Sequence, residues 1–124
     1  MSLQFNVTFD GVDASDALRE EILRRAGKVL PLVPEALSAT AVVERIVMRH
    51  RSGNRFNVRL RLAIPGQRFD VARAGGEPGH EDPLVAVRES FEALRRQIDA
   101  HHQAVRDASR RADARATTGS TANS

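Results

Sequence analysis

The strictest pattern in the sequence is an alternation of apolar and polar side chains between residues 56 and 64. Every second position there is apolar: Phe56, Val58, Leu60, Leu62 and Ile64. The positions between them hold Asn57, Arg59, Arg61 and Ala63. Successive side chains of a strand point to opposite faces, so this period of two predicts a β-strand that is buried on one face. The chain must therefore build a sheet with one covered face.

Turn signals on both sides of this segment predict strands that pair with it. Ser52-Gly53-Asn54 precedes it and Pro65-Gly66 follows it, and both runs are typical of hairpin turns. Residues 41–49 form the predicted strand before the first turn, although their pattern leaves open which face is buried. Residues 68–73 form the predicted strand after the second turn. Residues 3–9 also alternate, which adds a fourth strand.

Two further segments have helical spacing. Ser15 is the predicted N-cap of a helix that ends before Pro31, with Asp13 as a competing cap. Asp82 followed by Pro83 predicts the start of a second helix, with the acid as N-cap and the proline in the first turn. Apolar residues recur at intervals of three and four in both: Leu18, Ile22, Ala26 and Val29, then Leu84, Val87, Phe91, Leu94 and Ile98.

The predicted order is β-α-β-β-β-α, which defines the fold class as α+β. A strand, a helix and a strand form a right-handed crossover between parallel neighbours, and two hairpins add antiparallel strands. Both helices need a cover for their apolar stripes, and one face of a four-stranded mixed sheet can serve both. We expect a core drawn from five elements: Val7, Ile22, Leu60, Leu62, Phe69, Val71, Phe91 and Leu94.

The 124 residues suffice for one compact domain, which we assign to residues 1–102. Residues 103–124 are rich in Ala, Arg, Ser and Thr and offer no apolar face. We therefore expect a polar, largely disordered C-terminal tail, mobile from about Asp107 onward.

The residue types that catalytic and metal sites need are absent or badly placed. The chain has no cysteine, no serine in a nucleophile elbow and no phosphate-binding glycine loop before a helix. His80-Glu81-Asp82 lacks the spacing of metal ligands, and the adjacent His101 and His102 diverge on a helix, with His101 on the apolar stripe. We expect no enzyme activity, catalytic residue, metal or cofactor. No run approaches transmembrane length and no export signal is visible, so we expect a cytoplasmic protein without membrane contact.

Basic residues are unevenly distributed along the chain. The net charge is only +3, but eight arginines lie between residues 45 and 73 against one acid, Asp70. This excess favours an anionic partner such as nucleic acid, and arginines that are merely solvated are the alternative. Arg59 and Arg61 should lie on the sheet face opposite the helices, where we expect no cross-strand acids. The secondary RNA-binding candidates are Arg24, Arg49, Arg51, Arg55, Arg59 and Arg61.

Other basic residues flank the apolar stripes of the two helices. Arg88, Arg95 and His102 recur every seven residues on the second helix, and Arg25 and Lys28 lie beside the seam of the first. If the helices pack side by side, these residues line a shared ridge or groove. Long basic side chains that snorkel at the edge of a core are the alternative.

The start of the second helix resembles a known family. Residues 81–87 read Glu-Asp-Pro-Leu-Val-Ala-Val and residues 91–98 read Phe-Glu-Ala-Leu-Arg-Arg-Gln-Ile. Both are similar to the pattern of the ribosome hibernation promoting factors, also called ribosome-associated translation inhibitors or sigma-54 modulation proteins. The first-helix pattern, with Leu18, Arg25 and Lys28, is similar too. The resemblance covers roughly residues 3–102, and the family fold has the same order of elements.

The resemblance implies a stress-response factor that inhibits translation by occupying the tRNA and mRNA channel of the small ribosomal subunit. Basic residues on the helices would contact the 16S-type rRNA there, and Arg25, Lys28 and Arg96 stand where the family carries a base. With Arg88 and Arg95 they are the predicted RNA-binding residues. The sequence departs from the family where bases are common: Ala93, Asp99 and Ala100.

Longer family members carry a second domain that pairs ribosomes. Residues 103–124 are too short and too polar to form such a domain, so we expect a short form that is monomeric off the ribosome. We expect no binding to DNA. Two alternatives stay open. One is a general module for structured RNA, because double-stranded RNA domains share a helix-on-sheet layout and read shape. The other is a divergent regulator with no ribosomal target, because a fold does not fix a function.

Overall fold

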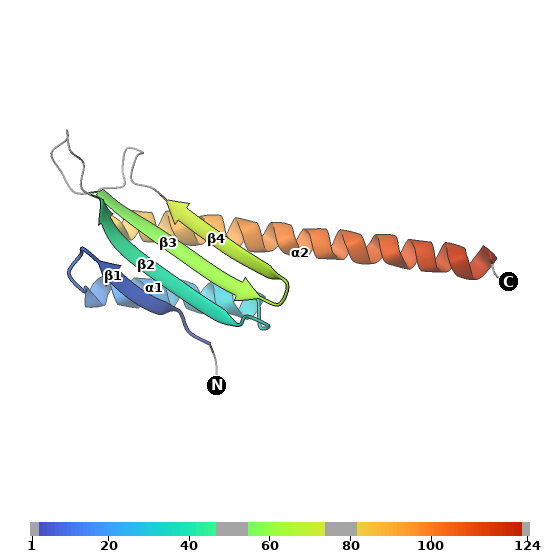
Figure 1. Ribbon diagram of the computed structural model, residues 1–124, viewed down its shortest axis with the longest axis horizontal. Coiled ribbons are helices and arrows are strands. Elements are labelled where there is room, and N and C mark those ends of the chain that lie inside the picture. The colour runs from blue at the N-terminus through green and yellow to red at the C-terminus, as the bar shows by residue number, and fades with distance from the viewer. Residues whose placement is uncertain (1–2, 47–54, 74–81, 123–124) are drawn as a thin grey trace.

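The structure, a computed structural model, describes residues 3–46, 55–73 and 82–122 and contains four strands and two long helices. The elements follow one another as β1 (Asn6–Asp10), α1 (Asp16–Val29), the short 3-10 helix η1 (Leu30–Leu32), β2 (Ser38–Ile46), β3 (Arg55–Ile64), β4 (Gln67–Arg73) and α2 (Pro83–Ala122). The sheet order is β1-β2-β3-β4, with β1 parallel to β2 and the other neighbours antiparallel (Figure 1). The predicted order and the mixed sheet are confirmed.

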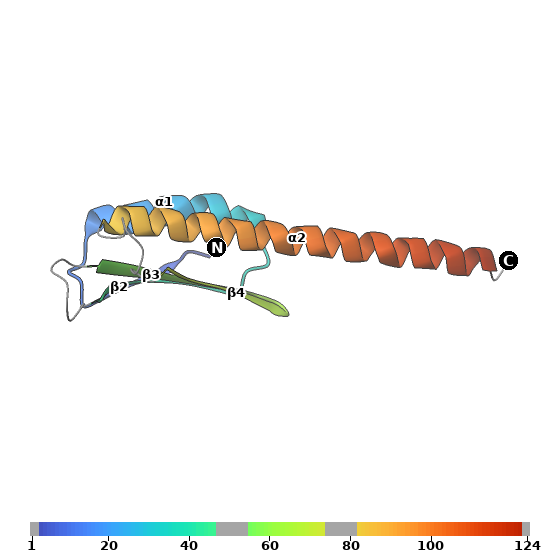
Figure 2. The same ribbon diagram turned by 90° about the horizontal axis from the view of Figure 1, so that it is seen from above.

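Both helices lie on the same side of the sheet, side by side, and leave its other face open (Figure 2). The predicted α+β layout with two helices on one face is therefore confirmed. The crossover from β1 through α1 to β2 places α1 over the first half of the sheet, while α2 contacts β3 and β4. This arrangement puts the two amphipathic helices next to each other above one shared core.

The face of β2 that the sequence left open is settled by its two neighbours. Val7 of β1 is in register with Ala41, and Val58 of β3 is in register with Val43. Ala41 and Val43 are completely buried beneath the helices, whereas Val42 is half-buried on the open face. Both faces of β2 are apolar in sequence, so only the pairing decides which one enters the core.

The core contains the residues that the periodicities predicted. Seven of the eight expected positions are buried, and Val7 is half-buried and packs against the rest. The Phe5 and Phe91 rings meet edge to face at 5.4 Å between centroids, which joins the N-terminal segment to α2. His101 packs edge-on against Phe69 at 5.5 Å, so the prediction that it serves packing is confirmed.

Both predicted N-caps are present. The Ser15 side chain accepts a hydrogen bond from the Leu18 amide at 3.3 Å, and Asp82 Oδ1 accepts one from the Leu84 amide at 2.9 Å. Each bond satisfies one of the amides that a helix leaves free in its first turn. These caps fix where α1 and α2 begin and thus which of their side chains face each other.

Residues 103–122, where we expected a largely disordered tail, continue α2 as a helix through Ala122. Alanine and arginine, which dominate this stretch, are strong helix formers, and the compositional argument about burial did not weigh that propensity. Local hydrogen bonds add support: Gln103 donates to Asp107 at 3.0 Å, and Arg106 donates to Gln103 at 2.8 Å. The helix projects beyond the sheet as a single rod (Figure 1).

Candidate nucleic-acid interface

A shallow groove of about 320 Å³ lies between side chains of α1 and α2. It is lined by Arg25, Lys28, Val29, Phe91, Glu92, Arg95 and Arg96. Four basic residues therefore converge on it against one acid. The structure brings together four of the five predicted RNA-binding residues from two helices that are far apart in sequence.

The packing of the helices explains why these side chains meet. Val29 and Phe91 are buried and form the floor of the groove. Arg25 lies one helical turn before Val29, and Arg95 lies one turn after Phe91, so each points along the same side of its helix as its buried neighbour. The apolar seam thus holds the basic residues in two facing rows.

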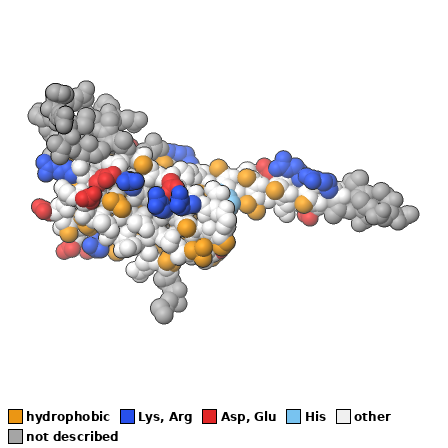
Figure 3. Space-filling view, in the orientation of Figure 1, with side chains coloured by type: hydrophobic (Ala, Val, Ile, Leu, Met, Phe, Trp, Pro, Cys, Tyr) orange, Lys and Arg blue, Asp and Glu red, His pale blue; other side chains and the backbone are white. Residues whose placement is uncertain are grey.

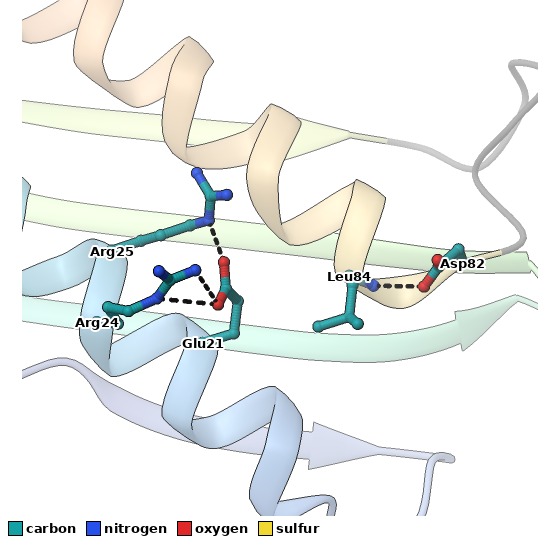
Figure 4. A network of polar contacts seen from close by, with 5 residues as sticks. All are labelled: Glu21, Arg24, Arg25, Asp82 and Leu84. Atoms are coloured by element: carbon teal, nitrogen blue, oxygen red, sulfur yellow. Dashed lines mark hydrogen bonds and ion pairs between the residues drawn. The ribbon is translucent and has the colours of Figure 1, made fainter.

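Glu21 pairs with Arg25 beside the groove. Its carboxylate accepts from Arg25 Nε at 2.6 Å through Oε1 and from Arg24 Nη2 at 2.6 Å through Oε2 (Figure 4). Hydrogen bonds from Arg24 and then Arg25 lower the pKa of Glu21 below its ordinary value of 4.5. Glu21 was not among the predicted site residues, although its spacing of four from Arg25 could have revealed the pair.

The remaining predicted residues of the helices lie outside the groove. Arg88 is exposed on α2, about 10 Å along the helix from Arg95, and is not part of the lining. Arg24 is also outside the lining and has a side chain that is 63% exposed, against 26% for Arg25. Arg95, which does line the groove, forms a 3.5 Å ion pair with Asp99 on its own helix.

The open face of the sheet carries a mixture of charges (Figure 3). Arg61 is in register with Asp70 of β4 and contacts it at 2.8 Å, and Arg68 contacts the same carboxylate at 3.1 Å. Arg59 lies 3.8 Å from Glu44 of β2. The expectation that this face lacks cross-strand acids is therefore wrong, because the strand register was not fixed by the sequence pattern.

These ion pairs reduce the charge that the sheet offers to an anion. Hydrogen bonding from Arg61 is the main cause that lowers the pKa of Asp70 below 3.8. Arg49 and Arg51 lie outside the described residues, and of Arg55 only the backbone, at the start of β3, is described. Arg25 and Arg95 of the inter-helix groove are also paired with acids, but the groove gathers four basic residues against one lining acid and is therefore the better-supported anion site.

The described part of the chain contains neither a metal-binding group nor a membrane-spanning helix. Residues 3–46, 55–73 and 82–122 contain no group of three His, Asp or Glu side chains placed to hold a metal ion. Within the same ranges no helix is long and apolar enough to cross a membrane. His80 and Glu81 of the rejected metal motif lie outside those ranges.

The same fold occurs in solved structures of other proteins. A ribosomal subunit interface protein from Coxiella burnetii superimposes with a TM-score of 0.64 at 18% identity, over 80% of this chain and 97% of that chain. The N-terminal domain of Protein Y from Thermus thermophilus superimposes with a TM-score of 0.57 at 13% identity, over 82% of this chain and 99% of that chain. A comparison with curated protein sequences gives no match.

The sequence itself matches a family model over residues 5–106, described as Sigma 54 modulation protein / S30EA ribosomal protein. This match spans β1, α1, the whole sheet and the part of α2 that covers the core. The chain therefore belongs to the Sigma 54 modulation protein / S30EA ribosomal protein family, whose members are ribosome-associated modulation and hibernation factors and not enzymes.

Proposed function

We propose that this protein inhibits translation by occupying the tRNA and mRNA channel of the small ribosomal subunit, as a monomer in the cytoplasm. The inter-helix groove binds the 16S rRNA backbone in this proposal. The observation that carries it is the convergence of Arg25, Lys28, Arg95 and Arg96 on one groove in a member of a ribosome-associated family. The protein acts by occupancy, and no covalent bond is made or broken.

The chemistry of the groove suits phosphate better than bases. Arginine presents donors in a planar fork that matches phosphate oxygens, and such contacts give affinity without reading sequence. Stacking on bases requires exposed aromatic faces. The chain has no Trp or Tyr, and Phe5, Phe69 and Phe91 are buried. We therefore expect affinity that depends on salt and recognition that depends on the shape of the rRNA.

The direct test is binding of purified small subunits by the Arg25→Gln/Lys28→Gln variant at two salt concentrations. Glutamine is chosen because a new carboxylate at position 25 would face Glu21. Each lost phosphate contact should reduce the slope of log affinity against log salt by roughly one unit, with duplex DNA as the guide. The variant should bind far more weakly and fold normally.

Two controls separate the groove from basic charge in general. Arg24→Gln removes the other partner of Glu21 but lies outside the groove, so it should bind nearly as well as the wild type. Arg59→Gln/Arg61→Gln removes the same number of charges from the open sheet face and should also have little effect. Equal losses in all three variants, or loss only in the sheet variant, would contradict the proposal.

A competition assay tests the target of the groove. Excess unrelated structured RNA should displace the protein from small subunits only weakly, because such RNA lacks the shape of the channel that the protein is proposed to occupy. Equal competition by such RNA would favour the general RNA-binding module. Displacement by initiator tRNA and mRNA is the expected sign of occupancy in the channel.

A further inference from the structure

The projecting part of α2 carries most of the net positive charge of the chain. Residues 103–115 contain four arginines and two aspartates, a net charge of +2 out of the total of +3. All four arginines are exposed: Arg106, Arg110, Arg111 and Arg115. Within the described part of the chain none of them is seen in an ion pair, and Arg106 bonds the neutral Gln103. Their charge is therefore available to an anionic partner.

Two of these arginines continue the α2 wall of the groove. An α-helix turns by about 100° per residue, so positions about eleven or fourteen residues apart lie on nearly the same side. Arg106 follows Arg95 by eleven residues, and Arg110 follows Arg96 by fourteen. Viewed down the helix axis, Arg106 and Arg110 both point in directions between those of Arg95 and Arg96. The continuous helix through Ala122 keeps them in that line.

The other two arginines point elsewhere. By the same turn angle, Arg111 and Arg115 lie roughly 110° and 150° round the helix from the middle of that arc. They have the same charge and exposure and belong to the same segment of helix. Arg111 and Arg115 therefore serve as a matched control for Arg106 and Arg110, because the two pairs differ only in the side of the helix on which they lie.

We propose that Arg106 and Arg110 form an extension of the groove that binds further phosphates of the same rRNA, about 12 to 18 Å beyond Ile98, the last buried side chain among those described in α2. This inference rests on the proposed function of the groove. Arginine without an acidic partner is complementary to a phosphate backbone and pairs with it through parallel hydrogen bonds.

A second copy of the chain is a poorer occupant of this helix. Pairing of helices requires large apolar residues repeated along one seam. Beyond Ile98 the apolar stripe of α2 continues mainly with Val105, Ala108 and Ala112, of which only Val105 is large, and it is 53% exposed. Such a seam buries too little surface to hold two copies together, which leaves the basic side as the functional one.

The experiment compares Arg106→Gln/Arg110→Gln with Arg111→Gln/Arg115→Gln in the full chain, measuring affinity for small subunits between 50 and 200 mM salt. Two lost phosphate contacts should make the decrease in affinity over this range about tenfold smaller for the first pair. The second pair should behave as the wild type. Asp113→Asn should tighten binding, because it removes an acid close to Arg110. Glutamine is a good helix former, and circular dichroism confirms that helicity is kept.

Each outcome decides the inference separately from the proposed function. If Arg25→Gln/Lys28→Gln loses binding while both tail pairs keep the wild-type salt slope, the groove stands and the extension is wrong. If the two tail pairs change the affinity and the salt slope equally, the tail acts through its net charge alone, and the inference of a directed extension is wrong. Weaker binding of Arg106→Gln/Arg110→Gln with an unchanged salt slope would indicate that the two arginines contact a protein surface, which would contradict the inference. If no variant changes binding, the proposed function itself fails.

Discussion

At the scale of single residues, Glu21 sets how much positive charge the groove offers. It bonds both Arg24 and Arg25 at 2.6 Å and partly neutralises the one that lines the groove. Glu21→Gln keeps a hydrogen-bond acceptor and removes the negative charge. We expect this variant to bind small subunits severalfold more tightly, with a steeper dependence on salt. Weaker binding would show that the carboxylate is needed to position Arg25, and Arg24→Gln serves as the neutral reference.

The same carboxylates predict how stability responds to acid. The pKa of Glu21 is lowered mainly by its hydrogen bonds with Arg24 and Arg25, and that of Asp70 mainly by its bond with Arg61. A carboxyl group whose pKa is lowered in the folded state stabilises the fold at pH values above its usual pKa, which is 4.5 for Glu21 and 3.8 for Asp70. This stabilisation is lost as the pH falls through the lowered pKa of the folded state. Denaturant unfolding from pH 7 to pH 3 should show a decline only at the acid end. Arg61→Gln should reduce that decline, and an unchanged profile would contradict the assignment.

Phe91 is the residue on which the groove floor and the core both depend. It is 3% exposed and contacts the ring of Phe5. Phe91→Ala should lower the free energy of unfolding by about 3–5 kcal/mol, because a cavity remains where the ring was. Urea unfolding measures the change. Leu84→Ala on the same helix is the control, since Leu84 is 45% exposed and its loss should cost much less. Equal effects of the two substitutions would contradict the packing described.

At the scale of elements, residues 103–115 of the projecting helix are stabilised chiefly by local interactions. Its side chains from 103 to 115 are exposed or half-buried, so the helix there depends on propensity and on pairs such as Gln103 with Asp107. Ala108→Gly should destabilise it by about 1 kcal/mol and leave the folded domain unchanged. Backbone chemical shifts of residues 103–115 measure the helical population, and urea unfolding checks the domain. A projecting segment with no helical shifts in the wild type would contradict this account.

The elements differ in how well their sequences predict them. The strand ending at Ile64 and the cap at Asp82 were predictable, because a period of two and an Asp-Pro pair each have one local cause. The buried face of β2 was not, since Val42 and Val43 are equally apolar and only pairing separates them. The pairing of Glu44 with Arg59 was missed for the same reason. The groove needed the relative placement of two helices, which no local pattern contains.

At the scale of the whole molecule, the shape is a compact domain with a long rod. A helix of 40 residues spans about 60 Å, whereas a compact chain of this length would have a radius of gyration of about 14 Å. Small-angle X-ray scattering should therefore give a maximum dimension above about 60 Å and a radius of gyration well above the compact value. The mass from the same data should match one chain of 13.6 kDa. A compact profile would show that the rod folds back, and a doubled mass would contradict the monomer.

The position of α2 in the chain has a consequence for biosynthesis. The apolar faces of β3 and β4, including Leu60, Leu62 and Phe69, are covered by the α2 segment that ends at Ile98. These strands are translated before their cover exists. A nascent chain must therefore expose an apolar sheet face until the α2 segment has been synthesised, and such faces promote aggregation and attract chaperones. A ribosome-associated factor with this topology completes the core of its own fold only after α2 has left the ribosome.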